Sequence, residues 1–361
     1  MQARVDCWSP HHSTPGLRRQ AELQTIPTLK ARFPRGAHHF RTQPVNSMPL
    51  HPQCQALVDA AAAAGSPFAT TEPKEARRGY DAGTLVYRHA TPALDSVANL
   101  VFAGPGGNVD VRVYRPRGSV RPAPALLYFH GGGWVVGNLD SHDHVCRYLA
   151  ARSGAVVIAV DYRLAPEHKF PAAYEDCLAA LSWITHAANE LGLDTTRFAV
   201  GGDSAGGSLA AGVALAARDA GGPGLRLQLL IYPSTDFTAD TPSLRDNASG
   251  YLLTTAAMQM FIDWYLPSRA ERNDPRASPQ LARDHAGVAP AFIQSAEFDP
   301  LRDEARIYAE TLRRAGVAAE YTCYAGMIHG FARMGARVDT AFNALDDAAG
   351  ALSRALGVAP V

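Results

Sequence analysis

The sequence predicts an α/β fold in which a mostly parallel sheet is covered by helices on both faces. Short apolar runs with the composition of buried parallel strands alternate with helical segments along the chain. The chain has 361 residues, 47% of them hydrophobic, and so can bury a large core. It contains neither internal repeats nor low-complexity linkers.

The elements follow from hydrophobic patterning after Met48. A helix is predicted over 51–64, and two strands over 95–103 and 108–114 form a hairpin around the glycine-rich turn at 104–107. The buried strands are predicted at 125–129, 155–160, 198–200, 225–231, 291–295 and 318–324.

Two segments depart from this alternation. Residues 1–47 carry seven basic and two acidic residues, a net charge of +5, without clear apolar periodicity. We expect a disordered N-terminal extension there; a transit peptide has a similar composition, but no apolar signal core is present. About sixty residues after 231 lack an obvious strand, although Met258 and Phe261 begin a helical apolar stripe. This insertion is either ordinary helix packing or a lid, since ligands bind at the carboxyl edge of such sheets.

Charge and cysteine content limit the partners. The 34 basic residues balance 34 acidic residues, so no basic stripe for nucleic acid is expected. No apolar run is long enough for a membrane span, and no stable membrane insertion is expected. The cysteines are scattered and never spaced C-x-x-C, which predicts free thiols in a reducing compartment, the cytoplasm. They are Cys7, Cys54, Cys146, Cys177 and Cys323. We separately expect a monomer or a homodimer.

A serine among glycines follows the apolar run at 198–200. Ser204 lies in the pattern G-x-S-x-G over 202–206, ahead of a segment with a helical apolar stripe. A strand that reverses sharply into a helix needs neighbours without Cβ, and it exposes the hydroxyl on a rigid elbow. The pattern predicts a nucleophile; a glycine-rich turn in which Ser204 only caps the helix is the alternative.

Three glycines follow the strand at 125–129, in the stretch HGGGW from His130 to Trp134. Their backbone N–H groups are uncovered and can point at a ligand oxygen. Acyl transfer places negative charge on the former carbonyl oxygen, and each preorganised donor there contributes about 3–4 kcal/mol. The stretch is therefore a candidate oxyanion hole, in which His130 holds the loop; a flexible loop is the alternative.

Several motifs occur in order between Met48 and the C-terminus. They are HGGGW at 130–134, DYRLAPEHKFPAA at 161–173, GDSAGG at 202–207, GYLLT at 250–254, DPLRDE at 299–304 and HGF at 329–331. With them the chain resembles the hormone-sensitive-lipase-like family of microbial carboxylesterases. The resemblance implies an α/β-hydrolase fold with a helical cap. The catalytic domain would comprise 89–236 and 276–361, and the cap 48–88 and 237–275.

The predicted catalytic triad is Ser204, Asp299 and His329. Catalytic groups in this fold lie on loops after strands, in the chain order serine, acid, histidine. Asp299 and His329 each follow a predicted strand, and the family's acid and base match these two positions. The other acids near Asp299 are Glu297, Asp303 and Glu304. The oxyanion donors would be the N–H groups of Gly132, Gly133 and Ala205.

Two further clusters receive a structural interpretation. His142 and His144 have a spacing that points them apart on a helix, so no metal site is predicted. Asp140 or Ser141 is instead expected to cap that helix, which would end at Gly154. The resemblance implies that Asp161, Arg163 and Glu167 brace the oxyanion loop.

The sequence thus predicts a serine carboxylesterase that hydrolyses short-to-medium acyl esters of small molecules without a cofactor. The expected substrate pocket is apolar and short, lined by Trp134, Phe261, Trp264 and Tyr265. A peptidase would use the same triad, but no additional recognition domain is visible. A binding protein is the other alternative, since related plant hormone receptors use this scaffold with a damaged triad.

Overall fold

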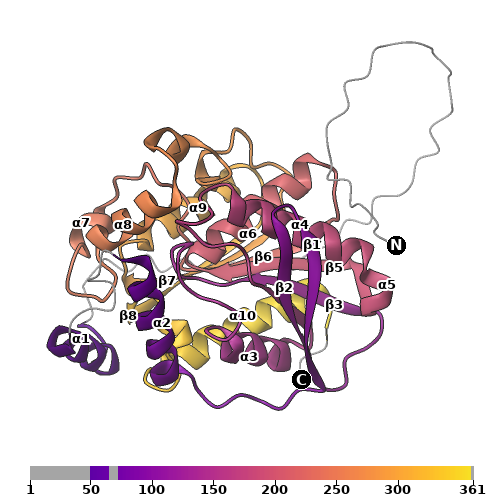
Figure 1. Ribbon diagram of the computed structural model, residues 1–361, viewed down its shortest axis with the longest axis horizontal. Coiled ribbons are helices and arrows are strands. Elements are labelled where there is room, and N and C mark those ends of the chain that lie inside the picture. Colours follow the sequence, from indigo (N-terminus) through magenta and orange to yellow (C-terminus); the bar gives the residue numbers. More distant parts are fainter. Residues whose placement is uncertain (1–48, 65–71, 359–361) are drawn as a thin grey trace, which may run out of the picture. The chain divides into compact units, whose positions relative to one another are not determined.

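The computed structural model describes residues 49–64 and 72–358. The chain divides into two units, Met1–Met48 and Pro49–Val361, and all described residues belong to the second. The predicted extension over 1–47, with Cys7, lies outside the described residues. Figure 1 shows the second unit as a central sheet with helices packed around it.

The sheet has eight strands in the order β1-β2-β4-β3-β5-β6-β7-β8. The hairpin strands β1 and β2 are antiparallel, as are β2 and β4, and every later pairing is parallel. All the predicted strands are therefore present. Their bounds are β1 (Ser96–Gly104), β2 (Gly107–Arg115), β3 (Ala123–Phe129), β4 (Val156–Val160), β5 (Leu193–Asp203), β6 (Leu225–Ile231), β7 (Ala291–Phe298) and β8 (Ala319–Ile328).

Helices cover both faces of the sheet, as predicted. Successive residues of a strand point to opposite faces, so Leu127 and Phe129 of β3 join one core cluster, whereas Leu126 and Tyr128 join the other. The first cluster includes residues of α4 (Ala172–His186), α6 (Ala205–Asp219) and α9 (Arg302–Arg314). The second includes residues of α3 (Asp143–Ser153) and α10 (Thr340–Leu356). The short helix α5 (Ala188–Leu191) precedes β5.

The predicted cap of α3 is wrong. Its N-cap is His142, without a side-chain cap bond, although the helix ends at Gly154 in the left-handed conformation as expected. The Ser141 hydroxyl instead bonds the backbone N–H and carbonyl of Asn138. The Asn138 side chain accepts from the backbone N–H of Asp140 and of Ser141. These local bonds hold the segment in a turn and delay the helix start.

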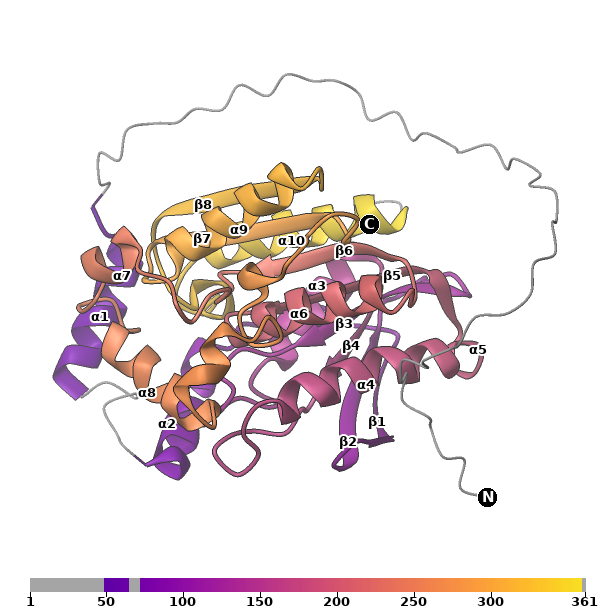
Figure 2. The same ribbon diagram turned by 90° about the horizontal axis from the view of Figure 1, so that it is seen from above.

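A second group of helices gathers at one end of the sheet in both Figure 1 and Figure 2. It comprises α1 (Pro52–Ala64), α2 (Pro73–Tyr87), α7 (Pro242–Asp246) and α8 (Thr255–Tyr265). The Thr254 side chain caps α8 by accepting from the backbone N–H of Ala257. Short 3-10 helices follow at Arg269–Asn273, Pro279–Leu281 and Phe331–Arg333. Two chain segments far apart in sequence thus meet where the parallel strands end.

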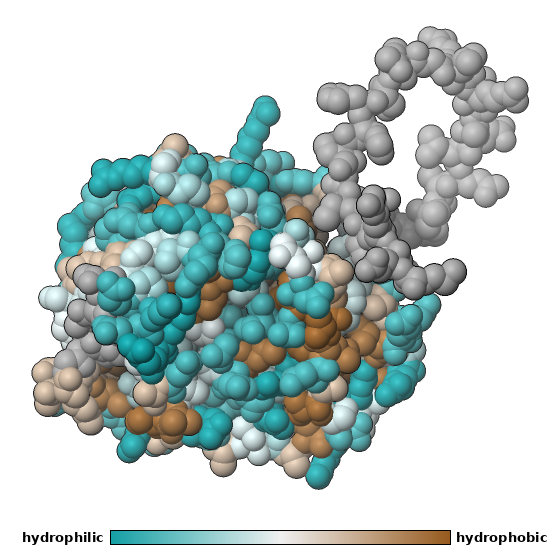
Figure 3. All heavy atoms as spheres, viewed as in Figure 1, coloured by the Kyte–Doolittle hydropathy of each residue, from teal (hydrophilic) through white to brown (hydrophobic). Residues whose placement is uncertain are grey.

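The surface in Figure 3 mixes hydrophilic side chains with separate hydrophobic patches. Large apolar side chains that are exposed among the described residues are Leu85, Val86, Val101, Val120 and Leu281. Within the described ranges, no helix has the length and apolar character needed to span a membrane.

Candidate active site

Ser204 lies at a sharp turn between β5 and α6. Its backbone has φ 53° and ψ −119°, an unusual conformation for a residue with a side chain. The backbone N–H of Ser204 donates to the carbonyl of Ile231 at 2.8 Å, which fixes the turn to the next strand. A Cβ at Gly202 or Gly206 would collide with the carbonyl oxygen of Phe129. The flanking glycines are therefore required by the close approach of β3.

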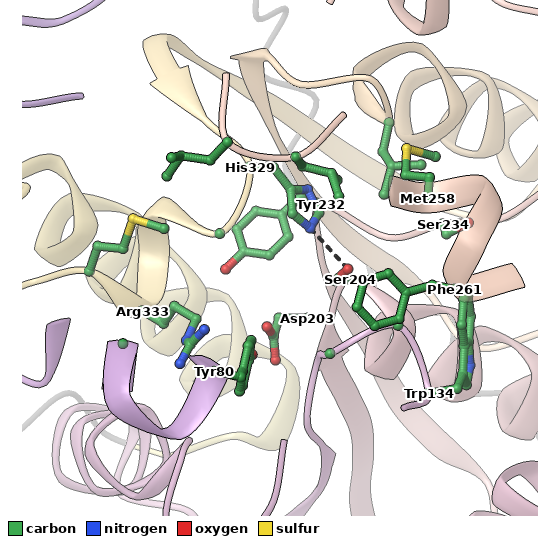
Figure 4. A pocket seen from close by; sticks show the side chains of 18 of the residues that line it. Tyr80, Trp134, Asp203, Ser204, Tyr232, Ser234, Met258, Phe261, His329 and Arg333 are labelled. Carbon is green, nitrogen blue, oxygen red and sulfur yellow. Dashed lines mark hydrogen bonds between the residues drawn. The ribbon is translucent and has the colours of Figure 1, made fainter. Parts of the chain in front are cut away.

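The structure brings Ser204, His329 and Asp299 into one hydrogen-bonded chain. The Ser204 Oγ lies 3.0 Å from His329 Nε2, drawn as a dashed line in Figure 4, and His329 Nδ1 lies 2.7 Å from Asp299 Oδ2. Asp299 is fully buried, and its second oxygen accepts from the backbone N–H of Leu301 at 2.8 Å. When Nδ1 carries the proton and donates to Asp299, Nε2 is free to accept the hydroxyl proton of Ser204.

The other candidate acids have different partners. Glu297 accepts from the backbone N–H of Gly326 at 2.8 Å, and Asp303 from that of Ser243 at 2.9 Å. Glu304 accepts from the backbone N–H of Thr235 at 2.8 Å. In the described part of the chain, Asp299 is the only one of these acids that hydrogen-bonds to His329.

Replacement of the buried Glu304 by glutamine is expected to stabilise the protein more at high pH than at low pH. Burial raises its pKa to about 8, against the lowering effect of two backbone N–H donors. From about pH 4.3, the usual pKa of an unfolded glutamate, to about pH 8, the folded state keeps a proton that the unfolded state has lost. The free energy of unfolding therefore falls as the pH rises through this window. Glu304→Gln removes this dependence, so its Tm advantage over the parent should grow from pH 5 to pH 8.

Differential scanning fluorimetry at pH 5, 6, 7 and 8 measures this advantage. Glu310→Gln, at a half-exposed position of the same helix, is the matched control and should shift Tm equally at all four pH values. A Glu304→Gln difference that stays flat across the series would contradict a protonated Glu304.

The glycine loop has the conformation that uncovers its N–H groups. Gly132 and Gly133 have φ of 125° and 57°, and Trp134 follows with 61°. A Cβ at Gly132 would collide with the carbonyl of Val136, and one at Gly133 would lie 2.7 Å from the Phe261 ring. No backbone carbonyl of the described residues accepts from the N–H of Gly132 or Gly133. Ala205 is the first residue of α6, so its N–H has no intrahelical acceptor either.

Asp203 connects this loop to the serine turn. Its Oδ1 accepts from the Tyr128 hydroxyl at 2.8 Å and from the backbone N–H of Gly131 at 2.9 Å. His142 Nε2 lies 3.3 Å from Oδ2. Burial alone would raise the pKa of Asp203, but His142 and the Tyr128 hydroxyl hold it below its usual range. The carboxylate stays charged and connects Gly131 to the turn that carries Ser204.

The histidines near the loop are packed into the protein. Burial lowers the pKa of His130 to about 3, so this ring is neutral at physiological pH. It stacks on Tyr162 at 4.2 Å between ring centroids, and the Tyr162 hydroxyl donates to the carbonyl of His130 at 2.6 Å. His144 Nε2 bonds the carbonyl of Arg333 at 2.8 Å.

The predicted brace of the loop is only partly formed by the predicted residues. Glu167 pairs with Arg77 of α2, whose Nε donates to the Val135 carbonyl at 2.8 Å. The Asp161 carboxylate accepts a backbone hydrogen bond from Leu139, in the segment after the glycines, whereas Arg163 binds Asp176. Arg77 could not be predicted from the sequence, because a lone arginine in a helix has no distinguishing pattern.

A cavity of about 160 Å³ opens over Ser204 and His329. Trp134 and Phe261 line it, as predicted, whereas Trp264 and Tyr265 do not. Tyr265 stacks on the Trp134 ring at 4.6 Å, and Trp264 packs edge-on against Phe261 at 5.4 Å, so both support the lining from outside it. Both residues lie one turn further along than Phe261, at the C-terminal end of α8, where Tyr265 also packs on Phe170.

Much of the cavity lining was not predicted from the sequence. Met258 and Ile262 share the face of α8 with Phe261, and this spacing was visible in the sequence. Other side chains come from α2, the GYLLT motif and the segment after HGF. They are Tyr80, Tyr87, Leu252, Leu253, Arg333 and Met334.

A family model described as the alpha/beta hydrolase fold matches residues 126–333. The chain belongs to the α/β-hydrolase family. This α/β-hydrolase is 41% identical over 305 residues to an ethyl acetate hydrolase of Pseudomonas putida, across 81% of this chain and 95% of that one. It is 47% identical over 241 residues to the carboxylic ester hydrolase LipN of Mycobacterium tuberculosis, across 65% of this chain and 64% of LipN.

Solved structures agree with this assignment. An ester hydrolase from the Lake Arreo metagenome, complexed with a bipyridine phosphonate derivative, is 42% identical to this α/β-hydrolase with a TM-score of 0.82. That match covers 86% of this chain and 100% of the other. A hyperthermophilic esterase from Pyrobaculum calidifontis is 39% identical with a TM-score of 0.81, covering 85% and 99% of the two chains. The predicted family, microbial carboxylesterases of this fold, is confirmed.

Proposed function

We propose that this α/β-hydrolase is a serine carboxylesterase that works through an acyl-enzyme intermediate. The observation that carries the proposal is the hydrogen-bonded chain from Ser204 through His329 to the buried Asp299, at the base of a largely apolar cavity. The relatives named as ester hydrolases support the choice of substrate class.

The mechanism follows from this geometry. His329 Nε2 takes the proton of Ser204 as Oγ attacks the ester carbonyl, and Asp299 stabilises the imidazolium that forms. The N–H groups of Gly132, Gly133 and Ala205 bind the oxyanion. His329 then protonates the leaving alcohol, water attacks the acyl-enzyme by the same route, and the acid is released.

The helices of 48–88 and 237–275 form the cap in this proposal, since both segments contribute residues to the cavity. The receptor alternative is less favoured because the serine, histidine and aspartate are in contact. A peptidase is less favoured because the relatives reported above are named for ester substrates. The cytoplasmic location and the monomeric or homodimeric state stay predictions from the sequence.

Covalent labelling tests the proposal. An organophosphonate with a nitrophenyl leaving group should modify Ser204 stoichiometrically, detected by peptide mass spectrometry, and should abolish hydrolysis of nitrophenyl butyrate in proportion. Labelling at another residue, or labelling without loss of turnover, would overturn the assignment.

Acyl-chain length should show an optimum. The cavity is small, and Phe261 and Ile262 restrict it above Ser204, so each added methylene contributes about 0.8 kcal/mol only until the space is filled. We expect kcat/KM to rise from acetate to a peak at about four to six carbons, then fall steeply. Nitrophenyl acetate, butyrate, octanoate and palmitate at matched solubility measure this. A maximum at palmitate with activation at an oil–water interface would identify a true lipase instead.

A further inference from the structure

One charged side chain of the cavity has no part in the proposed mechanism. Arg333 lines the cavity four residues after His329, and it is only 7% exposed. In Figure 4 its guanidinium group points toward Tyr80 and Asp203, on the side of the cavity away from Phe261 and Trp134. Burying a cation without a direct ion-pair partner costs free energy, so the groups around Arg333 indicate what role it has.

The protein satisfies this guanidinium only in part. Nη2 donates to the Thr84 hydroxyl at 2.9 Å, and Cζ lies 4.0 Å from the Tyr80 ring centroid. Nε is buried without a hydrogen-bond partner. No acidic side chain of the described ranges forms an ion pair with Arg333 at 4.0 Å or less.

Asp203 is only a distant counter-charge: Arg333 helps to lower the pKa of Asp203, but the two side chains form no ion pair within 4.0 Å. Asp203 is the only acidic side chain among the described residues that line the cavity. Its oxygens already bind Tyr128, Gly131 and His142. The cavity therefore combines an apolar side under α8 with a cationic corner under α2.

We propose that Arg333 is a specificity-determining residue that binds a carboxylate carried by the ester substrate, so that this α/β-hydrolase favours half-esters of dicarboxylic acids. The planar guanidinium presents N–H donors in a fork that matches a carboxylate, and a substrate carboxylate would supply the direct ion pair that Arg333 lacks. The rings of Tyr80 and Tyr87 flank the same corner, with centroids 4.0 and 6.0 Å from Cζ of Arg333. This inference rests on the proposed function of Ser204.

Three ethyl esters of related length separate charge from polarity. Monoethyl glutarate carries a carboxylate, diethyl glutarate carries a neutral ester at the same place, and ethyl hexanoate is apolar; ethanol release reports all three. Arg333→Met should lower kcat/KM for monoethyl glutarate by about 10- to 100-fold relative to ethyl hexanoate, through KM, as loss of a charge-assisted hydrogen bond implies. Arg333→Lys, which keeps the charge, should restore part of the ratio.

The ratio of kcat/KM for monoethyl glutarate to kcat/KM for ethyl hexanoate distinguishes carboxylate recognition from a structural role of Arg333. If Arg333 only anchors α2 through Thr84, the variant will lose activity on all three esters equally, and the proposal is overturned. An equal loss on diethyl and monoethyl glutarate would also overturn it, in favour of a neutral oxygen ligand. Arg276→Met removes a cation that packs on Phe170 outside the cavity lining and is the matched control; it should leave the ratio unchanged.

Free glutarate provides an independent measurement. It should inhibit ethyl hexanoate hydrolysis competitively in the parent protein, and its inhibition constant should rise about 10-fold or more in Arg333→Met. Absence of any turnover of ethyl hexanoate would count against the proposed esterase function. Turnover of ethyl hexanoate with no change of ratio in Arg333→Met would count against this inference alone.

Discussion

Ser204→Ala is expected to lower kcat for ester hydrolysis by about 10⁶-fold, by analogy with removal of the nucleophile from subtilisin. The hydroxyl is the atom that forms the acyl-enzyme, and neither His329 nor Asp299 can replace it. Because the alanine fits the same turn, the far-ultraviolet circular dichroism spectrum should not change. Single-turnover and steady-state assays with nitrophenyl butyrate measure the loss.

Ser208→Ala is the matched control for this experiment. Ser208 is a buried serine one turn further along α6, with its hydroxyl directed at the carbonyl of Ala277 rather than at His329. Its kcat should stay within a few-fold of the parent value, as expected for a residue without contact to the reacting atoms. Undiminished turnover by a clean preparation of Ser204→Ala would refute the mechanism.

Asp299→Asn should lower kcat by about 10⁴-fold, the effect of the wrong histidine tautomer. The asparagine amide would donate to His329 Nδ1, which places the ring proton on Nε2. Protonated Nε2 can no longer accept the proton of Ser204. The geometry of the site should be retained, because an amide replaces a carboxylate of the same shape. Steady-state kinetics with nitrophenyl butyrate from pH 6 to pH 9 measure the loss.

The neighbouring acids give the comparison for Asp299. Glu297→Gln and Asp303→Asn should each cost far less activity, since their carboxylates bond the backbone of Gly326 and Ser243 instead of the histidine. If either variant were as impaired as Asp299→Asn, the acid of the triad would have been assigned to the wrong residue.

The strands and the convergence of Ser204, Asp299 and His329 could be predicted from the sequence because both depend on local patterns. A continuous apolar run is sufficient to identify a buried parallel strand, and the loops after such strands meet at one edge of the sheet. Ser204, Asp299 and His329 all occupy such loops. Their convergence follows from chain order once the sheet is known.

The cavity wall was predicted less well because side-chain direction is a tertiary property. Trp264 and Tyr265 belong to the same helix as Phe261, yet they lie one turn further along it and pack against Phe261 and Trp134 instead of lining the cavity. Arg77 and Arg333 are placed by the docking of α2 on the loops after β3 and β8. No periodicity in the sequence encodes that docking.

Asp203 occupies the first of the two positions that the pattern G-x-S-x-G leaves open. In the structure this position binds Tyr128 of β3, His142 before α3 and Gly131, the first of the three glycines after β3. A substitution there would disturb three separate segments at once, so residues 128, 142 and 203 should vary together among relatives. Those three letters, read jointly, would separate proteins with this buried carboxylate from the many chains that carry the five-residue pattern by chance.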